Sequence, residues 1–281
     1  MAPSIGRGRR FGYTFFELNS LTELEQHHLN SLDVLIVPSK WATSICNKYI
    51  NDKIEVCPPG FNDLIFKPVE YMPPSCIFLS LGKWEVRKQQ DQIFRAFCKA
   101  FNNQDNVNLW MSCDNQFIPE ITQERKNHYK AILVNRINLI PKVKTPTDVS
   151  RLMQSSYCFV SPSLAEGWNL PLLEAMGCGK FTIATNYSGH TEFCTPETTV
   201  LLKPTGLIPA DDGMWFRPNN EINCGDWCTY DEEELVEGMR AIYKKYQEGE
   251  VLNIAGIDRA KDFTWKKSAE TMSRILGECY E

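Results

Sequence analysis

Short apolar runs and amphipathic segments alternate along most of the chain. Apolar runs of strand length occupy residues 33–39, 75–82, 107–113, 137–140, 157–163, 180–185 and 199–204. We predict helices at residues 89–101, where apolar residues recur on one side, at residues 119–134, where the helix is polar, and at residues 146–155. Strands that alternate with helices are joined by crossovers and therefore run parallel. The pattern predicts an α/β fold with a Rossmann-like, doubly wound parallel sheet, whose ligands bind at the carboxyl ends of the strands.

Prolines mark the best candidate for a boundary inside the chain. Pro68, Pro73 and Pro74 fall in a stretch with little periodicity, after a strand–helix–strand unit over residues 33–60. We therefore predict a partial N-terminal α/β portion over residues 1–68 and a C-terminal Rossmann-like domain over residues 69–281. Within the second, we expect residues 199–204 to form the last strand, residues 205–230 a long aromatic loop and residues 231–279 closing helices.

Composition excludes some classes of function. The 281 residues carry a net charge of −5, whereas a nucleic-acid binder usually presents a basic face. No apolar run has the length of a membrane span and no signal-peptide core is visible, so we expect a cytoplasmic protein. Eleven cysteines are present, but the closest pair, Cys224 and Cys228, has no second pair or histidine at zinc spacing. We predict no metal site and no cofactor.

The segment SPSLAEGWNLPLLEAMGCGK, residues 161–180, places two glutamates around a helix start at a strand end. Free main-chain N–H groups from Gly167 to Leu170 would point out of that start, where a phosphate can bind. Glu166 and Glu174 would repel phosphate, but they suit sugar hydroxyls. The alternative is that Glu166 is a helix N-terminal charge and Glu174 a solvated helix residue.

Two further strand ends carry polar turns. LGKWEVRKQQD, residues 81–91, gathers Lys83, Arg87 and Lys88, which can hold a diphosphate or can form a solvated basic turn. ATNYSGHTEF, residues 184–193, contains His190, which is either a ligand contact or, as we prefer, part of a helix cap.

These pieces in this order resemble the retaining GT-B glycosyltransferases of family 4. GKWEVRK is similar to that family's diphosphate-binding turn, with Lys83 in place of the commoner arginine. SPSLAEGWNLPLLEAMGCG is similar to its E-x7-E segment, with Trp168-Asn169 in place of the more usual Phe-Gly. NYSGHTEF and FTWKKSAE also have counterparts, so the resemblance covers about residues 12–281.

The resemblance implies roles for individual residues. Lys83 and Lys88 would neutralise the leaving diphosphate, and Glu166 would bind donor-sugar hydroxyls near the anomeric carbon, which makes these three the candidate catalytic residues. Glu174 would hold the ribose hydroxyls. The remaining expected contacts to the nucleotide sugar come from Gly82, Arg87, Gly167, Trp168, Asn169 and Leu170, with main-chain N–H groups completing the phosphate contacts and Trp168-Asn169 shaping the sugar pocket.

The family's first domain normally opens with a strand and a Gly-rich loop, and neither these nor its usual histidine has a counterpart here. His27 and His28 lie in a helical stretch and do not suit that role. Two functions follow. One is retaining, metal-independent transfer of a hexose from a UDP- or GDP-linked sugar to a glycan or other hydroxyl acceptor. The other is a donor-binding module that needs a partner chain to complete the acceptor domain.

Overall fold

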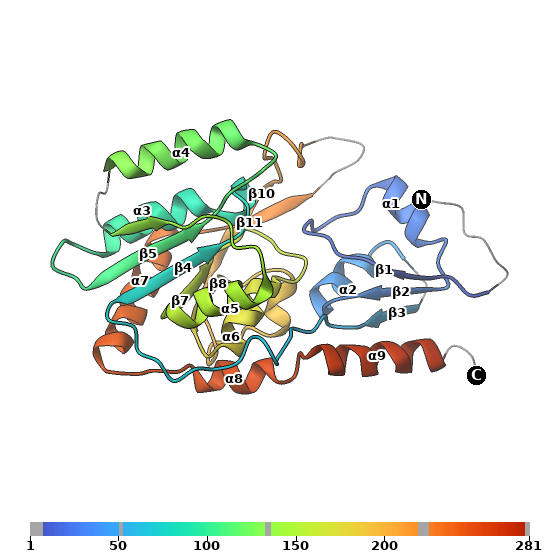
Figure 1. The fold of residues 1–281 in the computed structure, drawn as a ribbon. Helices are drawn as coiled ribbons and strands as arrows, with labels where there is room; N and C mark the ends of the chain where they lie inside the picture. Colours follow the sequence, from blue (N-terminus) through green and yellow to red (C-terminus); the bar gives the residue numbers. More distant parts are fainter. Residues whose placement is uncertain (1–7, 51–52, 133–135, 219–224, 279–281) are drawn as a thin grey trace.

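The computed structural model describes residues 8–50, 53–132, 136–218 and 225–278. Most of these residues form two parallel sheets, one of three strands and one of six, with the helices that connect and cover them. Figure 1 shows the small sheet at the right and the large sheet at the left. The parallel α/β architecture predicted from the alternation is confirmed.

The small sheet has the order β1-β2-β3 and two short helices. Its elements are β1 (Phe11–Tyr13), α1 (Glu23–Leu29), β2 (Val34–Val37), α2 (Lys40–Cys46) and β3 (Lys53–Val56). β2 is buried at every position, as its continuous apolar run predicted. The unpredicted strand β1 pairs with β2, from Phe11 opposite Val34 to Tyr13 opposite Ile36.

The large sheet has the order β6-β5-β4-β7-β8-β9. The strands are β4 (Cys76–Leu81), β5 (Val107–Ser112), β6 (Ile137–Leu139), β7 (Cys158–Ser161), β8 (Phe181–Thr185) and β9 (Val200–Leu202). The connecting helices are α3 (Gln90–Ala100), α4 (Pro119–Ile132), α5 (Pro146–Ser155) and α6 (Leu170–Gly177), with one-turn helices η1 (Val86–Lys88) and η2 (Gly189–Glu192).

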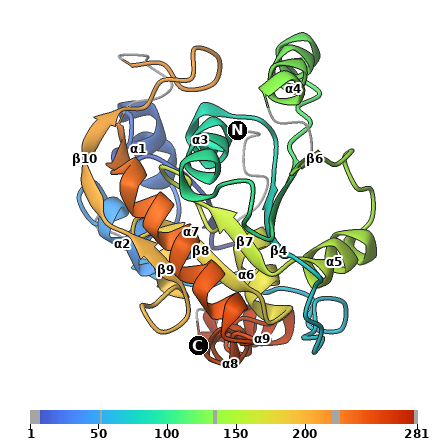
Figure 2. The ribbon, with the colours of Figure 1, turned by 90° about the vertical axis from the view of Figure 1, so that its left-hand side faces the viewer.

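Two hydrophobic clusters cover the two faces of the large sheet. On one face, α3 and α7 (Glu232–Gln247) enclose side chains such as Phe78, Phe97 and Met239. On the other face lie α5 and α6 (Figure 2). They enclose side chains such as Leu79 and Leu173. Phe78 and Leu79 are adjacent in β4 and enter opposite clusters, as the alternation of side chains along a strand requires.

The prediction of a long loop over residues 205–230 is wrong, because strands form both ends of this stretch. β10 (Pro204–Pro209) and β11 (Asp226–Tyr230) form an antiparallel pair in which Ile208 lies opposite Trp227. β-branched and aromatic residues fit such a pair. Residues 219–224 between the strands, which include Cys224, lie outside the described residues.

The closing segment is helical, as predicted, and returns to the small sheet. α8 (Ile254–Ala260) packs against α6, and α9 (Trp265–Glu278) runs below the small sheet in Figure 1. Ile275 and Met272 of α9 contact the cluster of Val34, Ile36 and Cys57. The segment assigned to the second predicted domain thus also covers the first sheet, and a boundary near residue 68 stays a prediction.

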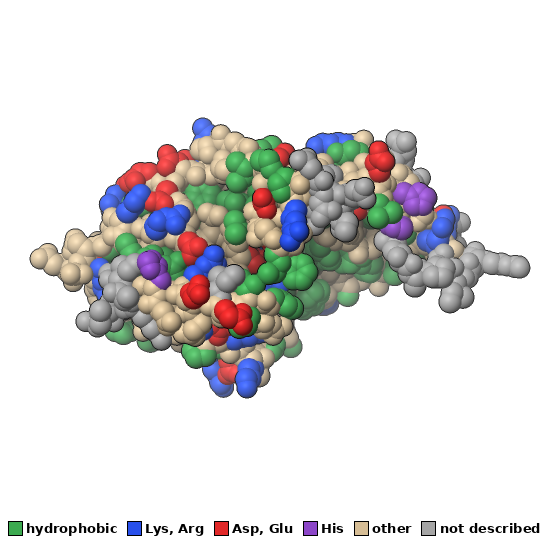
Figure 3. Space-filling view, turned by 90° about the horizontal axis from the view of Figure 1, so that it is seen from above, with side chains coloured by type: hydrophobic (Ala, Val, Ile, Leu, Met, Phe, Trp, Pro, Cys, Tyr) green, Lys and Arg blue, Asp and Glu red, His purple; other side chains and the backbone are tan. Residues whose placement is uncertain are grey.

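The surface in Figure 3 carries basic and acidic side chains interspersed, rather than gathered by sign. No helix in the described part of the chain combines the length and apolar character that crossing a membrane requires.

Candidate functional site

Two strand-end turns lie side by side at the carboxyl edge of the large sheet. β4 and β7 are neighbours in that sheet, so the turn at residues 82–88 and the loop at residues 162–169 leave it together. The Leu164 main-chain N–H donates a hydrogen bond of 2.8 Å to the Arg87 carbonyl oxygen. The two motifs that sequence analysis singled out are therefore in contact.

Glu166 connects these turns through its side chain. Arg87 Nη1 lies 2.9 Å from Glu166 Oε2, and Lys88 Nζ lies 3.3 Å from Oε1. Ser163 Oγ donates a further hydrogen bond of 2.8 Å to Oε1. Both carboxylate oxygens of this buried residue have partners, so Glu166 is more than a charge at a helix start.

The charge state of Glu166 follows from these partners. Burial alone would raise the pKa of its carboxyl, but Arg87, Lys88 and the hydrogen bonds from Arg87 and Ser163 lower the pKa to about 2. Glu166 is therefore a carboxylate at neutral pH and accepts hydrogen bonds.

In the turn at residues 82–88, Lys83 and Lys88 have different surroundings. Gly82 has a φ of 132°, and a Cβ built on it would lie 3.3 Å from the Lys88 side chain. Gly82 thereby lets Lys88 fold back over the strand end. Lys83 is half-exposed, with Nζ 3.2 Å from Glu85 Oε1 and 5.2 Å from the centre of the Phe117 ring. Lys83 and Lys88 are the more accessible cations of this turn, whereas Arg87 is buried.

The loop before α6 has an unusual backbone. Asn169 adopts left-handed backbone angles, with a φ of 75°, and its Nδ2 donates a hydrogen bond of 3.0 Å to Ser161 Oγ. Within the described residues, the main-chain N–H groups of Gly167, Trp168, Asn169 and Leu170 donate to no protein acceptor. They are the group expected to bind phosphate.

The indole of Trp168 lies in the hydrophobic core. Its ring centre is 5.0 Å from that of Phe193 and 5.6 Å from that of Phe263. The Nε1 atom has no hydrogen-bond partner among the described residues. The side chain packs the loop against Phe193, which follows η2, and Phe263, which follows α8, so a contact from Trp168 to the donor rests on its main-chain N–H.

Glu174 is partly buried, two turns into α6 as the spacing implied. Burial raises the pKa of its carboxyl from 4.5 to about 7, and the described residues offer it no ion pair or side-chain hydrogen bond. The alternative of a solvated surface residue does not fit this environment.

His190 is fully buried and is not a cap. The N-cap of η2 is Ser188, and His190 Nε2 forms a hydrogen bond of 2.6 Å with the Thr185 carbonyl oxygen at the end of β8. The preferred interpretation of His190 as a cap is wrong, because its ring is used to hold the strand end.

Glu17 is a charged neighbour of the site that sequence analysis missed. Its Oε1 lies 3.9 Å from Arg87 Nη2, although it comes from the segment between β1 and α1. Burial, together with Glu166 and Glu85, raises the pKa of Glu17, and Arg87 opposes this shift. The sequence offers little signal for Glu17 beyond the alternation of residues in GYTFFELNSL. Its partner, Arg87, lies about 70 positions further along the chain, and no local pattern indicates that contact.

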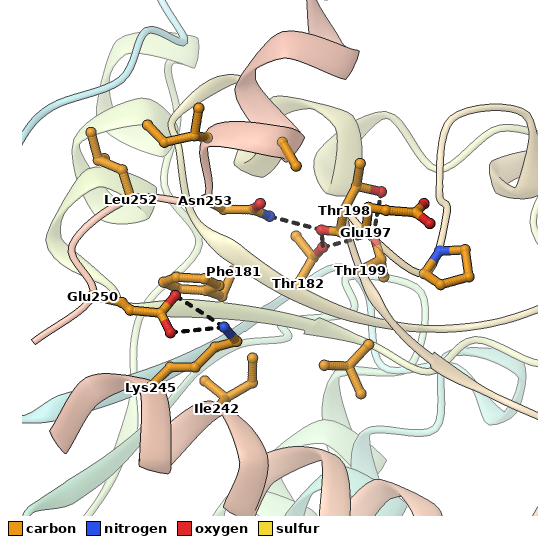
Figure 4. Close-up of a pocket in the computed structure, with 14 residues that line it drawn as sticks. Phe181, Thr182, Glu197, Thr198, Thr199, Ile242, Lys245, Glu250, Leu252 and Asn253 are labelled. Carbon is orange, nitrogen blue, oxygen red and sulfur yellow. Dashed lines mark hydrogen bonds and ion pairs between the residues drawn. The ribbon is translucent and has the colours of Figure 1, made fainter. Parts of the chain in front are cut away.

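A separate pocket of about 360 Å³ lies beside β8 and β9 (Figure 4). Phe181 and Val200, which begin β8 and β9, line it together with the Lys245–Glu250 ion pair. These are the amino ends of the strands. The pocket is therefore distinct from the site at the carboxyl edge.

Part of the chain matches a known protein family. Residues 75–212 match the family described as glycosyl transferases group 1. One component of the phosphatidylinositol N-acetylglucosaminyltransferase of Arabidopsis thaliana is 22% identical over 226 residues, which are 80% of this chain and 48% of that protein. The chain thus spans about half the length of this relative.

Solved structures agree on the fold. A glycosyltransferase from Rickettsia africae ESF-5 superposes with a TM-score of 0.74 at 18% identity, over 96% of this chain and 70% of that one. Anabaena Alr3699/HepE in complex with UDP-glucose has a TM-score of 0.71 at 13% identity, over 95% of this chain and 72% of that one. Residues 75–212 therefore belong to the group 1 glycosyl transferases of glycosyltransferase family 4, and the chain has the GT-B fold of the solved structures.

Proposed function

We propose that this chain transfers a hexose from a UDP- or GDP-linked sugar to a hydroxyl of a glycan or other acceptor, with retention at the anomeric carbon. The observation that carries the proposal is the contact between two strand-end turns through Glu166, Arg87 and Lys88. This contact puts accessible lysines, free main-chain N–H groups and a carboxylate at one sheet edge, where α/β folds bind nucleotides.

The proposed chemistry assigns each group a role. The bond between the anomeric carbon and the diphosphate oxygen breaks while that carbon forms a bond to the acceptor hydroxyl oxygen on the same face of the sugar. The hydroxyl proton passes to the leaving diphosphate oxygen, and Lys88 and Lys83 stabilise the charge that develops there. The main-chain N–H groups from Gly167 to Leu170 hold the phosphates. Glu166 accepts hydrogen bonds from donor-sugar hydroxyls and Glu174 from those of the ribose.

The comparisons support a UDP-linked donor as the first to test. The Arabidopsis relative is named for N-acetylglucosaminyl transfer, and the Anabaena structure holds UDP-glucose. UDP-N-acetylglucosamine and UDP-glucose, followed by GDP-linked sugars, are therefore the donors of choice.

One observation favours the second function, a donor-binding module completed by a partner chain. Among the described residues, the acceptor-side sheet has three strands against six on the donor side. Calorimetry would then detect binding of a nucleotide sugar without turnover, and turnover would appear only after the partner is added. Transfer by the purified chain alone would contradict this function.

The test of the enzyme proposal compares Lys88→Ala with Lys244→Ala. Lys244 lies on the exposed face of α7, so its replacement removes the same charge away from the site. Release of UDP or GDP from the donor is followed with and without saccharide acceptors. Because Lys88 would act mainly on the leaving group, we expect kcat to fall about 100-fold and the donor KM to change less.

Two results would count against the proposal. A folded wild-type chain that releases no nucleotide from any donor is not an active transferase by itself. Equal kinetics for Lys88→Ala and Lys244→Ala would instead remove Lys88 from the site.

A further inference from the structure

The segment from Tyr13 to Glu17 carries three aromatic side chains and a carboxylate. It continues β1, and the Thr14 N–H donates a hydrogen bond of 3.1 Å to the Ile36 carbonyl oxygen. Phe16 packs inward, with its ring centre 5.6 Å from that of Trp41. Tyr13 and Phe15 are exposed instead, and Glu17 is partly exposed beside Arg87.

Tyr13 and Phe15 form an exposed aromatic pair. Their ring centres are 4.8 Å apart, and the residues are 40% and 48% exposed. Tyr13 Oη donates a hydrogen bond of 2.6 Å to the Cys57 carbonyl oxygen, which fixes the pair to the end of β3. The pair is therefore a rigid aromatic surface that stays accessible to a ligand.

This surface adjoins the donor-binding loop. A Cβ built on Gly167 would lie 3.4 Å from Phe15 Cβ, and Glu17 Oε1 lies 3.9 Å from Arg87 Nη2. Arg87 in turn contacts Glu166. The small sheet thus brings an aromatic pair and a carboxylate next to the site proposed for the donor sugar.

Carbohydrates suit this combination of groups. One face of a pyranose ring presents C–H groups, which pack against the electron-rich face of an aromatic ring, while the hydroxyls at its rim need acceptors such as a carboxylate. We propose that Tyr13, Phe15 and Glu17 form the acceptor subsite and bind a terminal pyranose of a glycan, with Glu17 accepting a hydrogen bond from its hydroxyl. The proposal rests on the proposed function, because it makes this ring the one that receives the hexose.

The test uses the full chain and three disaccharides as probes: maltose, cellobiose and chitobiose. Saturation-transfer NMR measures binding of each probe in the presence of UDP. We expect transfer to ring protons for at least one probe, and binding about tenfold weaker in Phe15→Ala and Phe15→Leu, because an aliphatic side chain lacks the aromatic face. Glu17→Gln should also weaken binding, since a neutral amide is a poorer acceptor than a carboxylate.

Leu24→Ala is the matched control, because Leu24 is an exposed hydrophobic residue of α1 in the same half of the molecule. Retained disaccharide binding in this variant supports the proposal. Binding of UDP-sugars by calorimetry is measured for every variant, and circular dichroism checks that each is folded. The conservative Phe15→Leu keeps the comparison informative if Phe15→Ala does not fold.

Three results would overturn the acceptor subsite. The first is that no disaccharide shows saturation transfer. The second is that Phe15→Leu and Leu24→Ala bind the disaccharides equally well. The third is that the chain binds phosphatidylinositol vesicles in place of saccharides and that this binding depends on Phe15. Failure of the proposed function has a different signature. In that case the wild-type chain binds no UDP- or GDP-linked sugar, whatever its behaviour toward the disaccharides.

Discussion

Arg87 is a buried cation among three carboxylates. Its guanidinium lies 2.9 Å from Glu166, 3.2 Å from Glu85 and 3.9 Å from Glu17. A buried charge is tolerated when such partners surround it. The side chain is thereby paired with protein groups, and we infer that Arg87 positions Glu166, which leaves the more accessible Lys88 as the proposed contact to the donor. This refines the direct donor contact expected of Arg87 from the resemblance.

Glu174 gives stability a pH dependence that can be measured. The native pKa of about 7 lies above the ordinary value of 4.5, so the native chain binds the additional proton between these two values. Wild-type stability therefore falls as pH rises through this window. Glu174→Gln carries no titrating group there and should be more stable than wild type by about 1–2 kcal/mol at pH 8 and equal to it near pH 4.5.

Urea unfolding at pH 4.5, 6 and 8 measures this difference. Glu270→Gln serves as the control, because Glu270 is exposed on α9. A difference between wild type and Glu174→Gln that stays constant across the three pH values would mean that the burial of Glu174 has no such effect.

At the scale of elements, the turn after β8 packs against residues 162–169, the loop proposed to bind the donor and called the donor loop below. The Gly189 N–H donates a hydrogen bond of 2.9 Å to the Glu166 carbonyl oxygen, and a Cβ on Gly189 would collide with the Gly167 carbonyl oxygen. Glu166 N–H in turn donates a hydrogen bond of 2.8 Å to Ser188 Oγ. The loop and the turn are therefore one packed unit that only glycine at position 189 permits.

Gly189→Ala should consequently shift the donor loop. We expect a loss of about 1–3 kcal/mol in the free energy of unfolding, as for other overpacked sites, together with weaker binding of UDP-sugars. Gly206→Ala is the control, because its new Cβ would meet only Thr229 Oγ1, at an ordinary 3.5 Å. Urea unfolding and calorimetry measure both effects. Donor affinity as high in Gly189→Ala as in Gly206→Ala would contradict this role of the turn.

Local pattern was sufficient for the elements of the large sheet, because each of its strands lies within an apolar run of the kind that a buried parallel strand requires. The same rule failed at β10 and β11, which lie partly exposed as an antiparallel pair. The site divides in the same way. Glu166 and Lys88 follow strands that local pattern identifies, whereas Phe15 and Glu17 reach the site through a tertiary contact that no local pattern encodes.

At the scale of the whole molecule, α9 connects the end of the chain to the small sheet. Ile275 is completely buried in the cluster with Val34, Ile36 and Cys57, and Phe11 packs at its margin. The small sheet thus receives part of its core from the other end of the sequence. Its stability, and with it the position of the segment from Tyr13 to Glu17, should depend on α9.

Ile275→Ala tests this dependence. Removing a buried isoleucine side chain leaves a cavity, and we expect a loss of about 2–5 kcal/mol in the free energy of unfolding. Leu276→Ala, at the next position but 36% exposed, should cost much less. Urea unfolding followed by circular dichroism compares the two variants. If the sheets form one cooperative unit, Ile275→Ala shifts a single transition. A separate early transition that spares the UDP-sugar affinity would instead show that the small sheet unfolds independently of the donor half.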